Sequence, residues 1–599
     1  MKDFFKTVLA VIVGFLILNI ITSLLFMMMF GAMMALGSSK TVLPREGVLD
    51  LDMSKFILSE QTKTDNIDLS SLQSLSTEMT PALGILDAAK ALEIAAEDPG
   101  IKYVLLRADQ MSAGLAGLEE FRKSLVAFRE SGKPIVAYTN SLSAASLYLA
   151  SAADKIYMNS DCGSGGMLLG ISGRMMFLKD LLDKFGVNVQ LIRHGKYKSA
   201  GEMFIRNSAS EANMEQNQVM INSIWSSYAS EMAAARGMDA DKLNALIDDL
   251  TLVLPKDFLE AGIVDELLNR QQLIDKLCEL AGISDEKDLH LVPMMDYVDA
   301  KIVPALPTGK NLVAVIYAEG DIVDGNENKG IAGDRFARII AKVRKDKNVK
   351  AVVLRVNSPG GSVLASAKIK DELDLLKAEK PLVASYGDYA ASGGYWISNG
   401  CEKIYTDATT LTGSIGVFAM IPDLSKTLKD VAHVNITPVK SNKHSDMLSL
   451  MRPFDAEETA FMQAGIEDVY TNFVGIVSEG RSLTTEHVDS IAQGRVWTGA
   501  DALGIGLVDE IGTLQDAIGY AASLAGYEAS SEYKVVGYPR PLTMMEQMME
   551  SISGKKDDGL TAALKGTAFE GIASAIQELK ANEPAKAYAL MPYSIEIVK

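Results

Sequence analysis

The stretch IKYVLLR at residues 101–107 returns as VKAVVLR at residues 349–355, 248 positions later. Three more stretches return in the same order and at nearly the same spacing: KPIVA at 133–137 as KPLVA at 380–384, KIY at 155–157 as KIY at 403–405, and AGIVDE at 261–266 as IGLVDE at 505–510. Four ordered matches at a near-constant spacing indicate that the chain contains one module twice. We assign residues 47–285 to a first half, 286–311 to a connector and 312–530 to a second half.

Each half alternates amphipathic helices with short apolar strands. A helical face with apolar residues three and four positions apart precedes the repeated strand in both halves; these faces are Ile85, Ala88, Ala89 and Leu92, and Phe336, Ile339, Ile340 and Val343. Apolar strands that alternate with helices are typical of parallel sheets covered on both faces. The predicted fold class is therefore α/β, with two tandem domains whose sheets are largely parallel.

The two ends of the chain differ from these halves. No charged residue occurs from Thr7 to Ser39, a run longer than the roughly 20 residues that a membrane-spanning helix needs. It is also longer than the apolar region of a secretory signal, so we predict an uncleaved N-terminal membrane anchor at residues 1–40. Lys2 and Lys6 favour a cytoplasmic start, with most of the chain across the membrane. Residues 531–599 are predicted to be a C-terminal appendage.

Composition excludes several classes of function. The net charge is −19, with 77 acidic against 58 basic residues, which argues against a nucleic-acid-binding protein. Cys162, Cys278 and Cys401 stand far apart, and the five histidines include no HExxH pair, so no metal site is predicted. The chain also has no GxxxxGK[ST] phosphate loop. We expect no cofactor and no nucleic-acid partner.

The stretch DYAASGGYW at residues 388–396 holds a candidate nucleophile, Ser392, at the junction of a predicted strand and a predicted helix. Tight helix-to-sheet packing is the alternative explanation of its small residues, and the local sequence favours packing because the GxSxG elbow motif is absent. Asn357-Ser-Pro-Gly-Gly361 follows another predicted strand, and its glycines could turn N–H groups toward a ligand, as an oxyanion hole requires.

The two halves differ at the positions where chemistry would occur. At the 248-residue offset Ser392 corresponds to Ala144, whereas Lys198 faces Ser445. One half thus offers a serine and the other a lysine, which predicts a site assembled from both. A lysine base must be neutral although its ordinary pKa is about 10.4, and burial could lower that pKa. A histidine base is the alternative; the candidates are His194, His433 and His444.

Four motifs together resemble the signal peptide peptidase A family in its long, duplicated form: NSPGG at 357–361, AASGGYW at 390–396, TGSIGV at 412–417 and GKYKSA at 195–200. The resemblance implies a Ser/Lys dyad of nucleophile Ser392 and general base Lys198. It further implies an oxyanion hole from the N–H groups of Gly393 and Gly361, with Gly360 the second choice for the latter, and a lysine-orienting role for Ser414. Met203 departs from the family, in which a proline is common there.

This resemblance also implies a fold and a function. The fold would be similar to Clp protease and crotonase domains. The function would be a membrane-bound serine endopeptidase that degrades cleaved signal peptides and similar apolar peptides. The family implies a homotetramer in the bacterial cytoplasmic (inner) membrane, with its catalytic region on the periplasmic side. A crotonase-like acyl-CoA enzyme and a catalytically inactive membrane scaffold are the alternatives.

Overall fold

The computed structural model describes residues 14, 21–22, 42–62, 80–302, 309–327, 330–540 and 588–591. Nearly all of the predicted anchor at residues 1–40 lies outside this part of the chain. Among the described residues, no helix combines the length and apolarity needed to cross a membrane.

The first half is built on a six-stranded parallel sheet in the order β10-β7-β5-β4-β1-β11. Its strands are β1 (Gly47–Asp52), β4 (Ile101–Arg107), β5 (Ile135–Thr139), β7 (Lys155–Asn159), β10 (Glu266–Leu268) and β11 (Leu291–Pro293). Short strands β2 (Ile57–Ser59), β3 (Ala82–Gly84), β6 (Ser141–Leu142) and β8 (Gly165–Gly166) pair apart from it. The helices are α2 (Ile85–Glu97), α3 (Leu115–Arg129), α4 (Ala144–Ala150), α5 (Lys179–Lys184), α6 (Glu202–Ile205), α7 (Glu211–Ala235), α8 (Ala240–Asp248), α9 (Pro255–Glu260), α10 (Arg270–Ala281) and α11 (Met294–Lys301).

The second half repeats this strand order. Its main sheet runs β21-β19-β17-β15-β12-β23, and β18 pairs with β17 and β22; every pair is parallel except β19 with β21. The strands are β12 (Leu312–Glu319), β15 (Val349–Ser358), β17 (Leu382–Ala391), β18 (Ile404–Thr406), β19 (Leu411–Gly413), β21 (Val496–Thr498), β22 (Glu510–Ile511) and β23 (Lys534–Tyr538). The helices are α12 (Gly333–Lys345), α13 (Val363–Lys377), α14 (Gly393–Ser398), α15 (Ala456–Arg481), α16 (Thr485–Ile491), α17 (Gly499–Gly504) and α18 (Leu514–Leu524).

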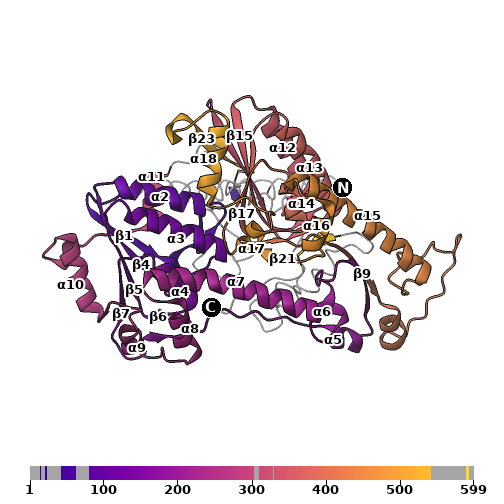
Figure 1. Ribbon diagram of the computed structural model, residues 1–599, viewed down its shortest axis with the longest axis horizontal. Helices are drawn as coiled ribbons and strands as arrows, with labels where there is room; N and C mark the ends of the chain where they lie inside the picture. The colour runs from indigo at the N-terminus through magenta and orange to yellow at the C-terminus, as the bar shows by residue number, and fades with distance from the viewer. Residues whose placement is uncertain are drawn as a thin grey trace, which may run out of the picture.

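One hydrophobic core joins the halves. Successive side chains of a strand point to opposite faces of the sheet, so β12 and β15 contribute to two clusters. Val315 and Val353 pack with α18 and with first-half residues such as Leu51, whereas Ile316 and Leu354 pack under α12 and α13. In Figure 1 the two sheets lie side by side, and α7 runs from the first half beneath the second.

A third sheet combines strands of both halves in the order β14-β13-β16-β24-β20-β9. Its strands are β9 (Asn188–His194), β13 (Ile322–Val323), β14 (Ile331–Ala332), β16 (Gly360–Ser362), β20 (Val417–Asp423) and β24 (Tyr588–Leu590). First-half β9 pairs antiparallel with second-half β20 over seven residues, from His194 opposite Val417 to Asn188 opposite Asp423. This pairing carries the loop after β9 into the second half.

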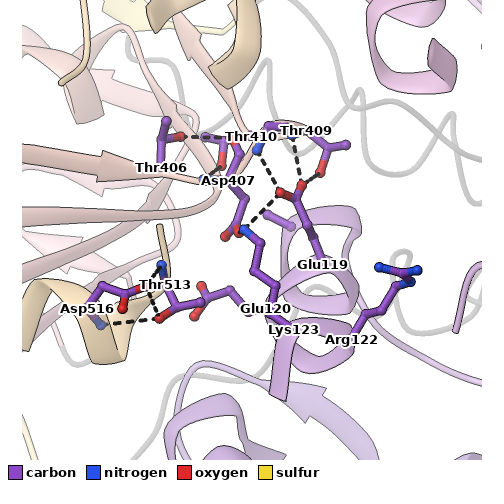
Figure 2. Close-up of polar contacts among 12 residues, drawn as sticks. Glu119, Glu120, Arg122, Lys123, Thr406, Asp407, Thr409, Thr410, Thr513 and Asp516 are labelled. Atoms are coloured by element: carbon purple, nitrogen blue, oxygen red, sulfur yellow. Dashed lines mark hydrogen bonds and ion pairs between the residues drawn. The ribbon is translucent and has the colours of Figure 1, made fainter. Parts of the chain in front are cut away.

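Buried ionic contacts also connect the halves, as Figure 2 shows. Lys123 on α3 lies 2.8 Å from Asp407 and 3.0 Å from Glu119. Glu119 accepts hydrogen bonds from the backbone N–H groups of Ala408 and Thr409. The side chains of Glu119 and Asp407 are 2% and 0% exposed, so these contacts lie inside the protein rather than on its surface.

Candidate active site

Ser392 stands where β17 ends and α14 begins. Its backbone angles are φ 56° and ψ −112°, a conformation that non-glycine residues rarely adopt. Backbone bonds hold the turn: the Ser392 N–H donates to the carbonyl of Gly413 (2.8 Å), and the Trp396 N–H donates to the carbonyl of Ser392 (2.8 Å). A strained strand-to-helix turn is therefore present without the GxSxG motif, and such strain is frequent at active sites.

The matching junction of the first half is ordinary. Ala144 is the first residue of α4, so the residue at the N-cap position that Ser392 occupies in α14 is Ser143. Ser143 has an extended backbone (φ −105°), and its hydroxyl caps α4 by accepting from the Ser146 N–H. The first half therefore keeps a hydroxyl near this position, contrary to the simple offset, but uses it to cap a helix.

Lys198 reaches Ser392 from the loop after β9. Its Nζ lies 2.8 Å from Oγ of Ser392, 2.9 Å from the carbonyl oxygen of Ser414 and 3.0 Å from Oγ of Ser414. All three residues are fully buried. The structure thus brings together three residues that the sequence singled out on separate grounds.

The surroundings of Lys198 favour its neutral form. Complete burial lowers the pKa of the amine well below its ordinary value of 10.5, because burial penalises the charged form. Among the described residues, the hydrogen-bond partners of Nζ are the hydroxyl and carbonyl oxygens of Ser392 and Ser414, with no carboxylate. A neutral amine can donate its two hydrogens to Ser414 and direct its lone pair at the Ser392 hydroxyl.

Two second-half glycines form a slot for the Lys198 side chain. A Cβ on Gly494 would lie 2.6 Å from both Cβ and N of Lys198, and a Cβ on Gly416 would lie 3.1 Å from its Cδ. Gly494 also has a positive φ of 79°. The sequence analysis missed both residues, since single glycines carry no distinctive motif; the Gln493-Gly-Arg495 turn was the one local signal.

Polar contacts hold the backbone of the loop. The Tyr197 N–H donates to the carbonyl of Gln493 (2.9 Å), and Arg193 donates to the carbonyl of Lys198 (2.6 Å). Gln216 on α7 donates to the carbonyl of Tyr197 (3.0 Å) and accepts from the Val496 N–H (3.3 Å). Gln216 therefore ties the lysine loop to a strand of the other half.

The predicted oxyanion residues lie on either side of the nucleophile. Gly393 is the first residue of α14, a position whose N–H has no partner within the helix. Gly361, in β16, has φ 152°, and a Cβ there would overlap the carbonyl oxygen of Ile322. Gly360 has φ 106°, and its N–H donates to Oγ of Ser358 (3.2 Å). Only glycine suits the backbone at these two loop positions.

The candidate histidine bases have other surroundings. His194 lies 2.5 Å from Glu467 through Nδ1 and stacks on Tyr470 with ring centroids 3.7 Å apart. His444 lies 2.9 Å from Glu458. His433 is exposed. These contacts leave Lys198 as the base candidate that is hydrogen-bonded to Ser392.

One group of described residues has metal-ligand character: the ligand atoms of His444, Asp455 and Glu458 lie within 4.8 Å of one another. Both acids already have partners, because Glu458 binds Arg452 (2.7 Å) and Asp455 caps α15 by accepting from the Glu458 N–H (2.9 Å). None of the three contacts the dyad.

Comparison with known proteins agrees with the family predicted from the motifs. The model of peptidase family S49 matches residues 127–284 and 374–528. Protease 4 of Salmonella typhi is 34% identical over 600 residues, which cover 96% of this chain and 95% of that protein. Protease 4 of Haemophilus influenzae is 35% identical over 509 residues (82% and 80%), and the chloroplastic serine protease SPPA of Arabidopsis thaliana is 31% identical over 499 residues (82% and 73%).

Among solved structures, a ClpP1 mutant from Listeria monocytogenes aligns over 94% of its chain and 34% of this one, with 14% identity and a TM-score of 0.24. That overlap is too slight to decide the fold relationship. The sequence matches, by contrast, extend across both halves and most of the chain. The chain belongs to peptidase family S49 and is a serine-type peptidase.

Proposed function

We propose that this enzyme is an endopeptidase with a Ser/Lys dyad, in which Ser392 is the nucleophile and Lys198 the general base. The observation that carries the proposal is the 2.8 Å contact between Lys198 Nζ and Ser392 Oγ in a fully buried setting. Burial lowers the pKa of Lys198, which makes a neutral amine available as a base. Ser/Lys pairs are a known variant of the serine nucleophile arrangement.

The reaction would proceed by acyl transfer. Lys198 takes the Ser392 proton while Oγ attacks a peptide carbonyl carbon, and the N–H groups of Gly393 and Gly361 stabilise the oxyanion. The C–N bond then breaks, and the Lys198 ammonium gives its proton to the leaving amine. Water attacks the acyl ester with Lys198 again as base, which releases the acid product and regenerates Ser392.

Fluorophosphonate labelling and peptide hydrolysis by the full chain test the dyad. Ser392→Ala should abolish both, and Lys198→Ala should lower both by about 10²–10⁴-fold. Lys196→Ala is the matched control, since Lys196 is exposed in the same loop and should leave activity unchanged. Full activity in either dyad variant would exclude this mechanism, and a CoA-dependent hydratase activity would favour the crotonase-like alternative.

We also propose that the substrates are apolar peptides, including cleaved signal peptides, and that residues 1–40 anchor the enzyme in the bacterial inner membrane with its catalytic region on the periplasmic side. The charge-free run from Thr7 to Ser39 supports the anchor. Membrane fractionation of the full chain, against a chain that begins at Gly47, tests it. Recovery of both forms in the soluble fraction would exclude an anchor.

A homotetramer is our further proposal for the assembly. All residues from 431 to 440 are exposed, and this stretch includes Val434, Ile436 and Val439, the last 99% exposed. An exposed apolar stretch of this kind suits burial against another copy of the chain. Light scattering after gel filtration should give four times the chain mass of 64.5 kDa. A monomeric mass at micromolar concentration would exclude the proposal.

A further inference from the structure

Strand β24 occupies a groove beside the dyad. It lies between β16 and β20 and runs antiparallel to both, with Gly360 opposite Leu590, and with both Ser362 and Phe418 opposite Tyr588. β16 contains the predicted oxyanion glycine, and β20 pairs with β9, which leads to Lys198. A segment from the C-terminal region therefore lies between two strands that flank the catalytic residues.

The end of β24 reaches the nucleophile. The Met591 N–H donates to the carbonyl of Pro359 at 2.7 Å. Proline has no N–H with which to bond back, so Pro359 leaves the Met591 carbonyl unpaired on this side. The Met591 side chain packs on Ala391, the residue before Ser392, and β24 lies against α14, the helix that follows it.

Two side chains anchor the strand in apolar pockets that both halves build. Tyr588 is 7% exposed and packs with Val189 and Phe204 of the first half and Phe418 of the second. Met591 is 4% exposed; its neighbours are Met220, Ile224, Ala391, Leu411 and Val496. Backbone pairing with alternate side chains in pockets is how an extended peptide binds by strand addition.

We propose that residues 588–591 are an internal competitor of the substrate: they occupy the groove that an extended apolar peptide must enter, so the enzyme acts only when β24 leaves. This inference rests on the proposed peptidase function. Because the competitor belongs to the same chain, its effective concentration is high, and only peptides that bind the two pockets well would displace it. Ser392 and Lys198 are both fully buried in this state.

The sequence after the strand suits a competitor that is not consumed. Pro592 follows Met591, so the bond after the Met591 carbonyl is a tertiary amide. Its nitrogen carries the proline ring instead of a hydrogen, which crowds the approach of a general acid to the leaving nitrogen. Replacement of this proline should turn the competitor into a substrate.

The first test is the rate at which a fluorophosphonate labels Ser392 in the full chain. Met591→Asp places a charge in an apolar pocket and should speed labelling by about tenfold or more, because the open state becomes dominant. Tyr588→Asp should act in the same direction. Met544→Asp, a change in the same C-terminal region but outside β24, is the matched control and should label at the parent rate. Equal rates in all four proteins would overturn the proposal.

A second measurement separates this inference from the peptidase proposal. In a Ser392→Ala background, trypsin cleavage after Lys586 should be slow with β24 bound and several-fold faster with Met591→Asp. That readout requires no activity of the enzyme, so it can succeed even if Ser392 is not the nucleophile. Equal trypsin rates would overturn the docking of β24 and leave the dyad proposal intact.

The third measurement is the mass of Pro592→Ala. We expect loss of residues 592–599 by hydrolysis of the bond after Met591, and no loss when Ser392→Ala is also present. An intact mass for Pro592→Ala, in a protein that hydrolyses other peptides, would contradict the placement of the Met591 carbonyl at the nucleophile.

Discussion

At the scale of single residues, burial rather than a neighbouring carboxylate prepares Lys198 for its proposed role. The amine is fully buried and contacts Ser392 and Ser414, so its pKa falls because charge is unfavourable there. A base of this kind loses activity as the pH falls through its pKa, since protonation removes the lone pair.

Lys198→Arg tests this requirement directly. A guanidinium stays protonated at every accessible pH, so the variant keeps the charge and lacks the base. We expect kcat to fall by about 10²–10⁴-fold at about pH 8, with no recovery up to about pH 10. The wild-type kcat/KM should instead rise with pH up to the lowered pKa of Lys198. An Arg variant within tenfold of the wild type would contradict the base assignment.

Gly494 gives a test of how the lysine is positioned. Gly494→Ala would put a methyl group 2.6 Å from Cβ of Lys198, so the loop must shift and kcat should fall by about tenfold or more, with little change in KM. Gly262→Ala is the matched control: its φ is +77°, close to the +79° of Gly494, but its Cβ would meet open space. Both variants carry the backbone strain, and only Gly494→Ala should lose activity; equal losses would point to strain alone.

At the scale of elements, one carboxylate of the second half caps a helix of the first. Helix α3 begins after Gly114 without a capping side chain of its own half, and Asp388 accepts from the Ala116 N–H at 2.9 Å. A Cβ on Gly114 would overlap the Asp388 carboxylate, which explains the glycine there. The pKa of Asp388 is raised to about 6, mainly by burial.

This raised pKa determines the sign of a pH effect. The folded protein binds the Asp388 proton more tightly than the unfolded chain, whose carboxyl has a pKa near 3.8, so this group favours folding below about pH 4 and loses that contribution as the pH rises to about 6. Asp388→Asn keeps an acceptor oxygen and removes the titration. Relative to the wild type, its free energy of unfolding should therefore increase by up to about 3 kcal/mol between about pH 4 and pH 7. Urea unfolding at both pH values measures this, and a constant difference would contradict it.

The sequence predicted elements well where the pattern was local or repeated. The stretches at 101–107 and 349–355 are β4 and β15, and the helical faces that begin at Ile85 and Phe336 lie in α2 and α12. The pairing of β9 with β20 was not predicted, because it joins residues more than 220 positions apart and no local pattern encodes such a partner. β24 escaped for the same reason, although Lys198 and Ser392 were found through the comparison of the two halves.

At the scale of the whole molecule, duplication explains why the site can be divided between halves. The order β11-β1-β4-β5-β7-β10 in one half matches β23-β12-β15-β17-β18-β22 in the other, so the repeat includes an edge strand after each half's last helix. Strand β11 lies in the predicted connector and β23 in the predicted appendage. With two similar modules held rigidly together, each supplies one member of the proposed dyad, and the contact between the halves sets the distance between Lys198 and Ser392.

The ion pair of Lys123 with Asp407 tests that dependence on the inter-half contact. Lys123→Met would leave Asp407 and Glu119 buried without their cation, and loss of one partner of a buried pair destabilises by about 3 kcal/mol. The loss should grow as the pH rises, because burial raises the pKa of Asp407 and protonation relieves the unpaired charge at low pH. Lys155→Met is the control: Lys155 is 57% exposed, 3.2 Å from Asp265, and should change stability by less than about 1 kcal/mol. Urea unfolding together with peptide hydrolysis at about pH 6 and pH 8 measures both effects, and an equally small loss in the two variants would show that the buried contact does not hold the halves in register.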